Sequence, residues 1–288
     1  MSTSAPRSAY IHVPFCKHRC GYCDFAVIAG RDDLVETFLE ALATELSWLG
    51  GPQPVDTLYF GGGTPSHLDA AQLERLCDTV LQWHPLAAGA EWTVEGNPES
   101  VSLERLRVLA QHGVTRLSLG AQAFDEGKLR ALDREHSRND VVRSVEQVRS
   151  AGLQVAIDLM FAAPGETLDG WRQELREAIE LAPDHVSTYG LTWERGTSFT
   201  RQRDAGRLAQ LDEELERAMY AEAIDALTAA GLEHYEVSNF ARPGRRSRHN
   251  EVYWAGNEYF AAGPGAARYV DGVRETNHRS TTTYLVCV

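Results

Sequence analysis

Three cysteines near the start of the chain have the residue type and spacing that bind a metal centre. Cys16, Cys20 and Cys23 are three of the five cysteines and follow a C-x3-C-x2-C pattern. A closed structural zinc site takes four ligands. A cubane iron–sulfur cluster has four irons, so three thiolates would leave one iron free for a ligand that is not protein. The triplet therefore indicates a metal centre, and a [4Fe-4S] cluster is one interpretation of it.

A second interpretation uses the nearby histidines. His12 or His18 could supply the fourth ligand of a structural zinc site. The chain would then be a zinc-stabilised binding protein without radical chemistry. Anaerobic reconstitution separates the two interpretations, because a cluster protein turns brown whereas a stoichiometric zinc protein stays colourless.

Further glycine and polar signals lie at the ends of apolar, strand-like segments. Glycine has no Cβ and lets the backbone approach a ligand closely, and a buried carboxylate is costly unless something pairs with it. The carboxyl ends of parallel strands form the face where barrel enzymes build their sites. The signals are the run Gly61-Gly62-Gly63-Thr64-Pro65 and the residues Glu95, Gln122 and Asp158.

The elements that would position these residues alternate regularly. Near-continuous apolar strands between amphipathic helices are typical of a parallel sheet covered by helices, which can wind into a barrel or stay an open sheet. Strands are predicted over 9–15, 55–60, 91–95, 115–121, 154–161 and 185–192. Helices are predicted over 32–49, with Asp32 and Asp33 as caps, and over 69–83, 102–112, 125–132, 138–151, 168–182 and 208–230. After residue 231, a strand is predicted over 233–238, and the last fifteen residues show no helical pattern.

Taken together, these motifs resemble the radical S-adenosylmethionine (SAM) superfamily. The wording of residues 10–25, YIHVPFCKHRCGYCDF, is similar to its HemN/HemW branch. The resemblance implies an α/β fold, a partial (β/α)6 barrel over 1–231, with a small C-terminal extension over 232–288. It also implies a further small domain, normally present after the extension, that is absent from this chain.

The resemblance also implies the cofactors and their contacts. Cys16, Cys20 and Cys23 would hold a [4Fe-4S] cluster whose fourth iron is chelated by SAM, and the reduced cluster would cleave SAM to a 5′-deoxyadenosyl radical. The implied SAM contacts are Tyr10, Tyr22, Gly62, Gly63, Thr64, Glu95, Gln122, Arg134 and Asp158.

A last motif resembles the HNxxYW sequence of HemW-type proteins, which is associated with haem. Residues 249–254 read HNEVYW, and imidazole and phenolate are both axial ligands of haem iron. The implied haem contacts are His249, Asn250, Tyr253 and Trp254. The alternative is a loop histidine with two aromatic rings packed on the barrel.

Two activities of the branch compete. One is a haem chaperone of the HemW type; the other is oxygen-independent coproporphyrinogen III oxidase, an enzyme of porphyrin biosynthesis. Asp24 and Phe25 after the third cysteine, the nine residues before Tyr10 and the HNEVYW motif all favour the chaperone. Whether SAM is cleaved or only bound stays open, and so does enzyme status.

The composition of the chain limits the compartment and the partners that are expected. The net charge of −13 disfavours nucleic acid as a partner. Residues 1–8 do not form a signal peptide, and no run of eighteen apolar residues could span a membrane. A cytoplasmic protein is expected, with haem and haem-accepting proteins as partners; transient contact with membrane proteins is compatible with this. Cys77 fits a helix core, and Cys287 has no predicted role.

Overall fold

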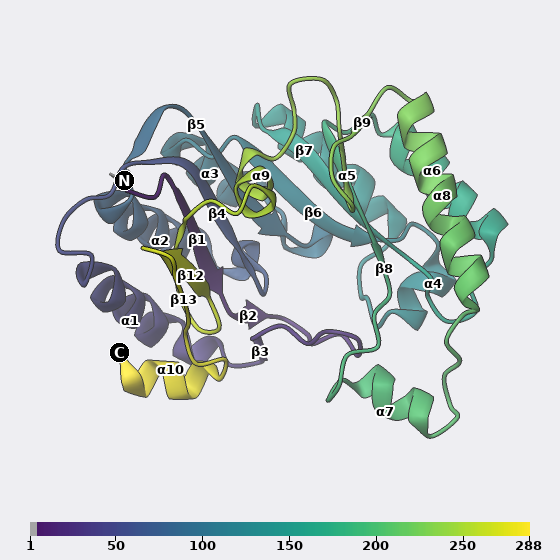
Figure 1. The fold of residues 1–288 in the computed structure, drawn as a ribbon, viewed down its shortest axis with the longest axis horizontal. Coiled ribbons are helices and arrows are strands. Elements are labelled where there is room, and N and C mark those ends of the chain that lie inside the picture. Colours follow the sequence, from purple (N-terminus) through teal and green to yellow (C-terminus); the bar gives the residue numbers. More distant parts are fainter. Residues whose placement is uncertain (1–4) are drawn as a thin grey trace.

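The computed structural model of the protein describes residues 5–288, and its elements alternate between strand and helix for most of the chain (Figure 1). A nine-stranded sheet has the order β11-β1-β4-β5-β6-β7-β8-β10-β9. Its central strands pair in parallel and in chain order. They are β1 (Ser8–Val13), β4 (Val55–Gly62), β5 (Leu86–Gly96), β6 (Arg116–Gln122), β7 (Gln154–Phe161) and β8 (His185–Gly190). The sheet does not close on itself within residues 5–288, which confirms the partial barrel.

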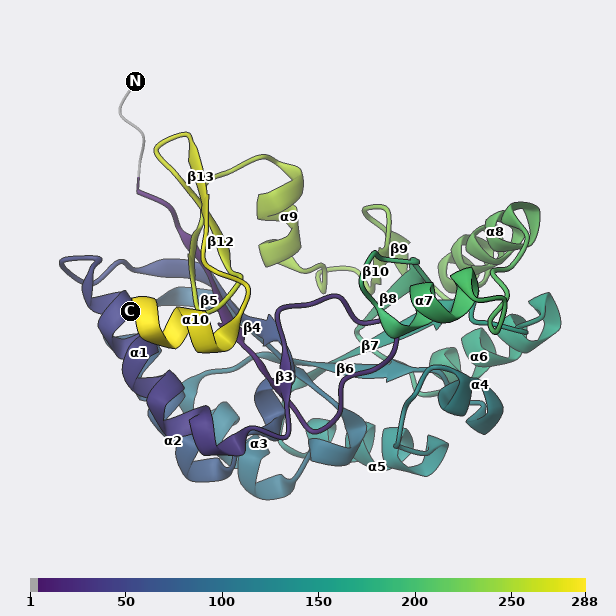
Figure 2. The same ribbon diagram turned by 90° about the horizontal axis from the view of Figure 1, so that it is seen from below.

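Helices cover the outer side of this curved sheet, where they form an arc in Figure 2. Several begin at side-chain caps: Asp69 and Ser137 form capping boxes, and Ser102 accepts a hydrogen bond from the Arg105 amide. The covering helices are α1 (Val35–Ser47), α2 (Ala70–Trp83), α3 (Leu103–His112), α4 (Glu126–Ala131), α5 (Arg138–Ser150), α6 (Leu168–Glu180) and α8 (Glu213–Ala229).

The two faces of the sheet differ in chemistry because successive side chains of a strand point to opposite sides. On β5, Trp92 and Val94 are buried in the apolar core, where the Trp92 ring meets the Phe60 ring edge to face at 5.0 Å. The alternate residues, Thr93 and Glu95, line a cavity on the inner side instead. The outer face therefore holds the fold together, and the inner face is left for polar groups.

Some predicted boundaries are wrong. Asp32 and Asp33 lie in a 3-10 turn before α1, and Leu34 precedes the helix without a side-chain cap. The last long helix begins at Glu213 rather than at 208, because Asp212 caps it through the Glu214 amide. The predicted strand 233–238 is replaced by two short strands, β9 (Glu233–His234) and β10 (Asn239–Ala241), which pair antiparallel.

The segment after residue 231 adds strands to both edges of the sheet. β10 pairs antiparallel with β8, and β11 (Phe260–Ala262) pairs parallel with β1. The hairpin of β12 (Ala267–Val270) and β13 (Val273–Thr276) follows. The extension is therefore continuous with the main sheet, and the division of the chain at residue 231 stays a prediction.

Three short helices have no counterpart among the predicted elements: α7 (Ser198–Asp204), α9 (Arg248–Trp254) and α10 (Thr281–Cys287). The expectation that the last fifteen residues contain no helix is wrong. Ser280 caps α10 through the Thr283 amide, and the buried Tyr284 hydroxyl donates to Glu45 on α1 at 2.6 Å. Tertiary contacts thus stabilise a helix whose several β-branched residues do not favour helix formation. No helix within residues 5–288 has the length and apolar character needed to cross a bilayer.

Candidate cofactor site

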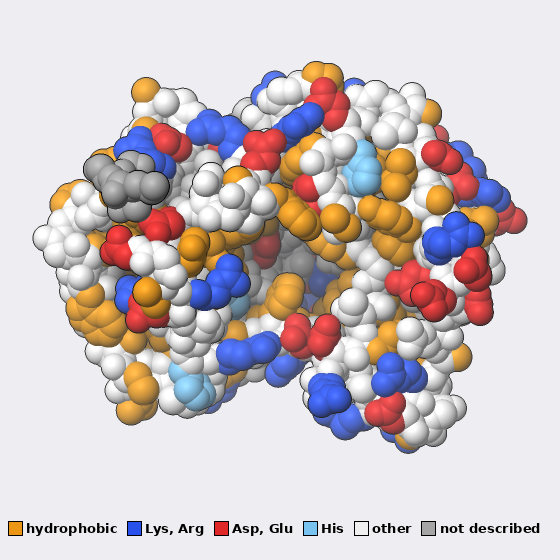
Figure 3. Space-filling view, viewed as in Figure 1, with side chains coloured by type: hydrophobic (Ala, Val, Ile, Leu, Met, Phe, Trp, Pro, Cys, Tyr) orange, Lys and Arg blue, Asp and Glu red, His pale blue; other side chains and the backbone are white. Residues whose placement is uncertain are grey.

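The inner face of the sheet surrounds a cavity of about 540 Å³. In Figure 3 the molecule is hollowed at the centre of this view, with charged side chains on the rim. The cavity brings together the three cysteines and most of the residues predicted to contact SAM. The predicted residues that line it are Cys16, Cys20, Tyr22, Cys23, Gly62, Gly63, Thr64, Glu95, Gln122, Arg134, Asp158 and Asn250.

The cysteine loop is anchored at the carboxyl end of β1. Its two ends form a short parallel pair, β2 (Phe15–Cys16) with β3 (Ile28–Ala29). The glycine run lies against its start, because Gly63 N donates to Val13 O and Thr64 N donates to Phe15 O, each at 2.8 Å. These bonds place the cysteines beside the glycine turn.

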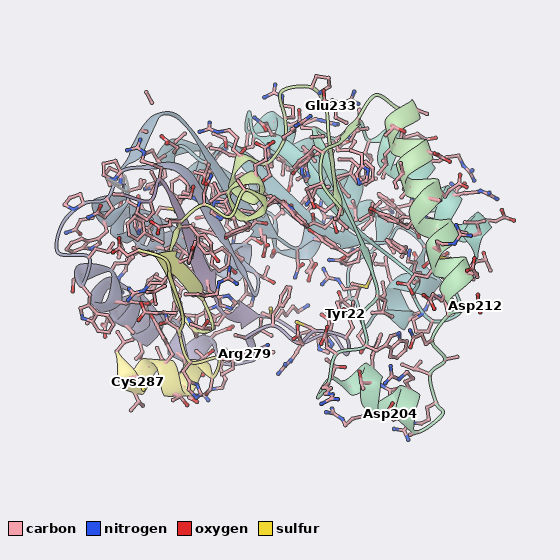
Figure 4. The ribbon with its side chains drawn as sticks, in the orientation of Figure 1. Tyr22, Asp204, Asp212, Glu233, Arg279 and Cys287 are labelled. Atoms are coloured by element: carbon pink, nitrogen blue, oxygen red, sulfur yellow. The ribbon has the colours of Figure 1, made fainter. Side chains whose placement is uncertain are left out.

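Helix α7 holds the middle of the same loop. The Phe199 amide donates to Gly21 O at 2.9 Å, and the Phe199 ring packs edge-on to Tyr22 at 5.9 Å between centroids. Asp133 accepts the Gly21 amide at 3.1 Å. Figure 4 labels Tyr22 on the loop, close to the connection that leads into α7. Sequence reasoning missed Phe199, since nothing local to residues 198–204 points to the cysteines.

A chain of side-chain contacts connects two of the cysteines across the cavity wall. The Cys16 sulfur lies 3.5 Å from Thr64 Oγ1, which accepts from Asn97 Nδ2 at 2.9 Å. Asn97 Oδ1 accepts from Arg134 Nη2 at 2.7 Å, and Arg134 Nη1 donates to the Cys20 sulfur at 3.6 Å. Asn97 was not predicted as a site residue, although it follows Glu95 in the Glu-Gly-Asn-Pro turn.

The three thiols share one environment. Burial raises the pKa of the Cys16 thiol to about 11, Thr64 lowers it, and the Cys23 and Cys20 thiols raise it further. Within residues 5–288, no three side chains of His, Cys, Asp or Glu lie close enough to bind a single metal ion. His12 is not available as a fourth ligand, because its ring nitrogens contact the Tyr10 hydroxyl and Ala26 O. A cubane cluster differs in that each thiolate binds a different iron, and three thiols of one loop around one cavity fit that donor set.

The glycines of the turn are required by the fold itself. Gly62 has a φ of 107°, and a Cβ there would lie 2.4 Å from the His12 ring; a Cβ on Gly63 would lie 2.7 Å from Phe15 O. The amides of Gly62, Gly63 and Thr64 all donate within the chain. The close approach that these glycines allow is therefore made first to β1, and these three amides are already used within the chain.

Glu95 and Asp158 are both paired inside the chain. Tyr59 donates to Glu95 Oε1 at 2.8 Å and Gly62 N donates to Oε2 at 3.0 Å, so this carboxyl is paired without a ligand. Burial raises the pKa of Glu95 to about 7, against the effect of these two donors. Asp158 accepts from Ser118 at 3.1 Å, and burial raises the pKa of its carboxyl to about 6. Two carboxyl groups with raised pKa values thus face one cavity.

Arg134 is half-buried rather than solvated. Its Nη2 donates to Gly120 O at 2.7 Å, and its Nε is buried without a hydrogen-bond partner among the described residues. Gln122 lies at the end of β6 with a left-handed φ of 63°, a backbone conformation that residues other than glycine adopt rarely. An unpartnered donor and a strained backbone on one cavity wall are typical of a built binding site.

The residues expected to bind haem lie on α9 and do not share one environment. His249 is buried, with Nδ1 2.9 Å from Thr57 Oγ1 and Nε2 2.8 Å from the Tyr253 hydroxyl, so neither nitrogen is free for iron in this arrangement. Tyr253 and Trp254 are 40% and 62% exposed. Asn250 faces the cavity from the same helix.

Tyr10 lies outside the lining of this cavity, and its contact with SAM stays a prediction. Its side chain stacks on Tyr59 with ring centroids 6.0 Å apart, and its hydroxyl lies 3.1 Å from His12 Nδ1. Tyr10 contacts Tyr59, and Tyr59 in turn contacts Glu95.

Comparison with known proteins gives consistent matches. Residues 10–178 match the pattern of the Radical SAM superfamily. The chain is 39% identical to the heme chaperone HemW of Lactococcus lactis, covering 97% of this chain and 74% of that protein, and 38% identical to HemW of Bacillus subtilis, covering 97% and 75%. Among solved structures, coproporphyrinogen III oxidase (HemN) from Escherichia coli superimposes with a TM-score of 0.85 at 25% identity, covering 98% of this chain and 69% of that one.

Proposed function

The chain belongs to the radical SAM superfamily and to its HemN/HemW branch, and from this premise we propose that it is a haem chaperone of the HemW type. It would bind a [4Fe-4S] cluster, SAM and haem, and deliver haem to acceptor proteins. The observation that carries the proposal is the 39% identity with the heme chaperone HemW of Lactococcus lactis over 97% of this chain.

Cys16, Cys20 and Cys23 would hold the cluster. When bound and reduced, such a cluster supplies the electron that can break a carbon–sulfur bond of SAM. Arg134, beside Cys20, would offset part of the negative charge of the thiolates. The hydrogen-bonded chain from Thr64 through Asn97 would fix that guanidinium in place.

The same cavity provides groups of the right chemistry for SAM. Carbonyl oxygens of the turn at Gly62 and Gly63 suit an ammonium group, and Glu95 and Asp158 can accept hydrogen bonds from hydroxyl or ammonium groups. The Tyr22 ring offers an apolar face, and the side-chain amide of Gln122 can donate and accept. Tyr10 would act indirectly, through Tyr59.

Haem would bind at α9. The partly exposed Tyr253 and the exposed Trp254 offer an apolar face for a macrocycle, while Asn250 connects the same helix to the cavity. Ligation of iron by His249 would first require the Tyr253 hydroxyl to release Nε2. The haem-accepting proteins and a cytoplasmic location, which suits a protein with reduced cysteines, belong to the same proposal.

The experiment that tests the proposal is titration of anaerobically reconstituted protein with haem, read from the Soret band. Wild type is expected to bind haem stoichiometrically and to pass it to an apo-haem protein. His249→Ala is expected to weaken or alter the spectrum. If reconstituted wild type shows no saturable haem binding, the chaperone function is wrong.

A second candidate is coproporphyrinogen III oxidase, which is favoured by the TM-score of 0.85 with HemN. It is tested in the same preparation by adding coproporphyrinogen III, SAM and a reductant, and following protoporphyrinogen IX. Conversion over many turnovers would replace the chaperone proposal; a product yield below one per chain would leave the chaperone as the better description.

A further inference from the structure

The histidine of α9 points into the molecule. The Thr57 hydroxyl donates to Ser8 Oγ at 2.9 Å, so its oxygen is left to accept from His249 Nδ1–H. Burial lowers the pKa of His249 to about 3, so the ring is neutral and Nε2 accepts from the Tyr253 hydroxyl. Both ring nitrogens are committed, and the orientation of the ring is fixed from two sides.

One face of this fixed ring lies against Tyr59. The centroids of the His249 and Tyr59 rings are 5.2 Å apart and their planes differ by 28°. Tyr59 has one polar atom, and it donates to Glu95 Oε1 at 2.8 Å. Glu95 in turn accepts the Gly62 amide with its other oxygen at 3.0 Å. A continuous set of contacts therefore runs from α9 to the glycine turn of the candidate SAM site.

We propose that His249 is a positioning residue for the SAM site: together with Tyr10, which also stacks on Tyr59, it holds the plane of Tyr59 so that the phenol hydroxyl stays on Glu95. A phenol turns about its χ torsions unless its faces are packed, and a hydrogen bond weakens steeply when its angle is lost. The inference rests on the proposed function in one respect, namely that Glu95 contacts SAM. It assigns the motif histidine a task at SAM that is separate from haem.

The ionisation of Glu95 reports this geometry. Burial, followed by the charge of Asp158, raises its pKa, whereas the Tyr59 hydroxyl and the Gly62 amide lower it. Losing the phenol donor removes a group that favours the ionised carboxylate, so the pKa must rise. One charge-assisted hydrogen bond corresponds to roughly 10-fold to 100-fold in an equilibrium constant, or about 1–2 pH units.

The two phenols that face His249 titrate above the range of Glu95. Tyr59 and Tyr253 face its ring, and Glu91 accepts its backbone amide at 3.1 Å. Burial raises the pKa of both phenols above the ordinary value for tyrosine. If SAM affinity falls at a different low pH in variants of His249 or Tyr59, the change therefore reports the ionisation of Glu95 and of the nearby Asp158.

The test compares two replacements of similar volume. His249→Phe keeps a flat ring against Tyr59 and loses both nitrogens; His249→Leu fills the space without a flat ring. Tyr59→Phe removes the donor itself. The control is Tyr284→Phe, because that buried phenol also donates to a glutamate, Glu45, at 2.6 Å but lies outside the cavity.

SAM affinity of the reconstituted proteins is measured by calorimetry from pH 6 to pH 9. The acid limb, the fall in SAM affinity toward low pH, is expected to move up by about 1–2 pH units in Tyr59→Phe. It should move less in His249→Leu and least in His249→Phe, which keeps a flat ring but loses both hydrogen bonds, and it should not move in Tyr284→Phe. The proposal is overturned if the Leu and Phe replacements at position 249 behave alike, or if Tyr59→Phe lowers affinity equally at every pH.

A second measurement does not depend on SAM. The infrared band of the protonated Glu95 carboxyl, identified by its absence in Glu95→Gln, is titrated in ligand-free protein. The same order of shifts is expected. If the pKa of the band shifts as predicted but wild type binds no SAM, His249 positions Tyr59 and the proposed function is wrong. If SAM binds but the band has the same pKa in all variants, the positioning role is wrong and the proposed function is unaffected.

Discussion

The Phe199 amide donates to the Gly21 carbonyl, and the Phe199 ring occupies the space that a side chain at Gly21 would need. The bond is 2.9 Å long, and a Cβ on Gly21 would lie 2.4 Å from the ring. Gly21 lies between Cys20 and Cys23, so a helix that comes nearly 180 residues later in the chain determines the shape of the cysteine loop.

Gly21→Ala is therefore expected to prevent normal cluster assembly. A Cβ at this position would lie 2.4 Å from the Phe199 ring and 2.5 Å from Asp133 Oδ2, so the loop must move, which displaces cysteines that share one centre. Iron and acid-labile sulfide per chain after reconstitution are expected to fall several-fold. Gly51→Ala is the control, because no atom lies within 4 Å of a Cβ there. Adding Phe199→Leu removes one of the two clashes at Gly21 and should restore part of the iron; equal iron content in Gly21→Ala and Gly51→Ala would contradict the role of Phe199 and Asp133 in shaping the loop.

Replacing any one of Cys16, Cys20 and Cys23 by Ser is expected to abolish the brown chromophore, since each thiolate serves a different iron. Cys287→Ser is the matched control, because that thiol is exposed on α10 and outside the cavity. The measurement is the visible absorption spectrum after anaerobic reconstitution. A full spectrum in any of the three variants would show that the triplet is not the ligand set.

Stability of the ligand-free protein is expected to depend on the Glu95 carboxyl. Its pKa is raised to about 7 in the folded chain, above the ordinary value for glutamate. The folded chain then binds more protons than the unfolded chain below that pH, and ionising Glu95 costs stability as the pH rises through about 5 to 7.

Glu95→Gln removes that dependence. When the pH is raised from 5 to 8, the free energy of unfolding of wild type is expected to fall by about 2 kcal/mol relative to that of the variant. The comparison uses the change with pH, so a constant cost of altered hydrogen bonds cancels. Urea unfolding at both pH values measures it, and parallel curves for the two proteins would contradict a raised Glu95 pKa.

Trp254→Ala is expected to separate haem binding from stability. The side chain is 62% exposed, so its removal should change the free energy of unfolding by no more than about 0.5 kcal/mol. Haem affinity should fall, because the ring would lose its contact with the macrocycle. Trp48→Ala at the end of α1, 61% exposed, is the matched control for losing a surface tryptophan. Equal haem affinity in both variants would remove Trp254 from the haem site.

The central strands and most of the covering helices could be predicted because they depend on local pattern. Apolar runs of strand length alternate with helices that begin at caps such as Asp69 and Ser137. Short helices could not be predicted in this way. The helix at 281–287 exists because Tyr284 reaches Glu45, a contact between residues 239 positions apart.

The sequence could predict which residues belong to the candidate site, but not which residues they contact. Glu95 could be identified from its place at a strand end, but its partners Tyr59 and Gly62 come from the neighbouring strand. The motif histidine could be identified from its sequence, but nothing in that sequence indicates that its ring is buried against Tyr59. A single chain gives the type of residue at each position and not the direction in which each side chain points.

The sequence alone determined the parallel α/β architecture, the cysteine triplet and the polar residues at the strand ends, because each depends on spacing along the chain. The tertiary structure decided which residues orient these groups. Phe199 at Gly21, Asn97 between Thr64 and Arg134, and His249 on Tyr59 are contacts between distant segments. Such contacts arise only when the sheet curves, since curvature brings the inner faces of separate strands around one cavity.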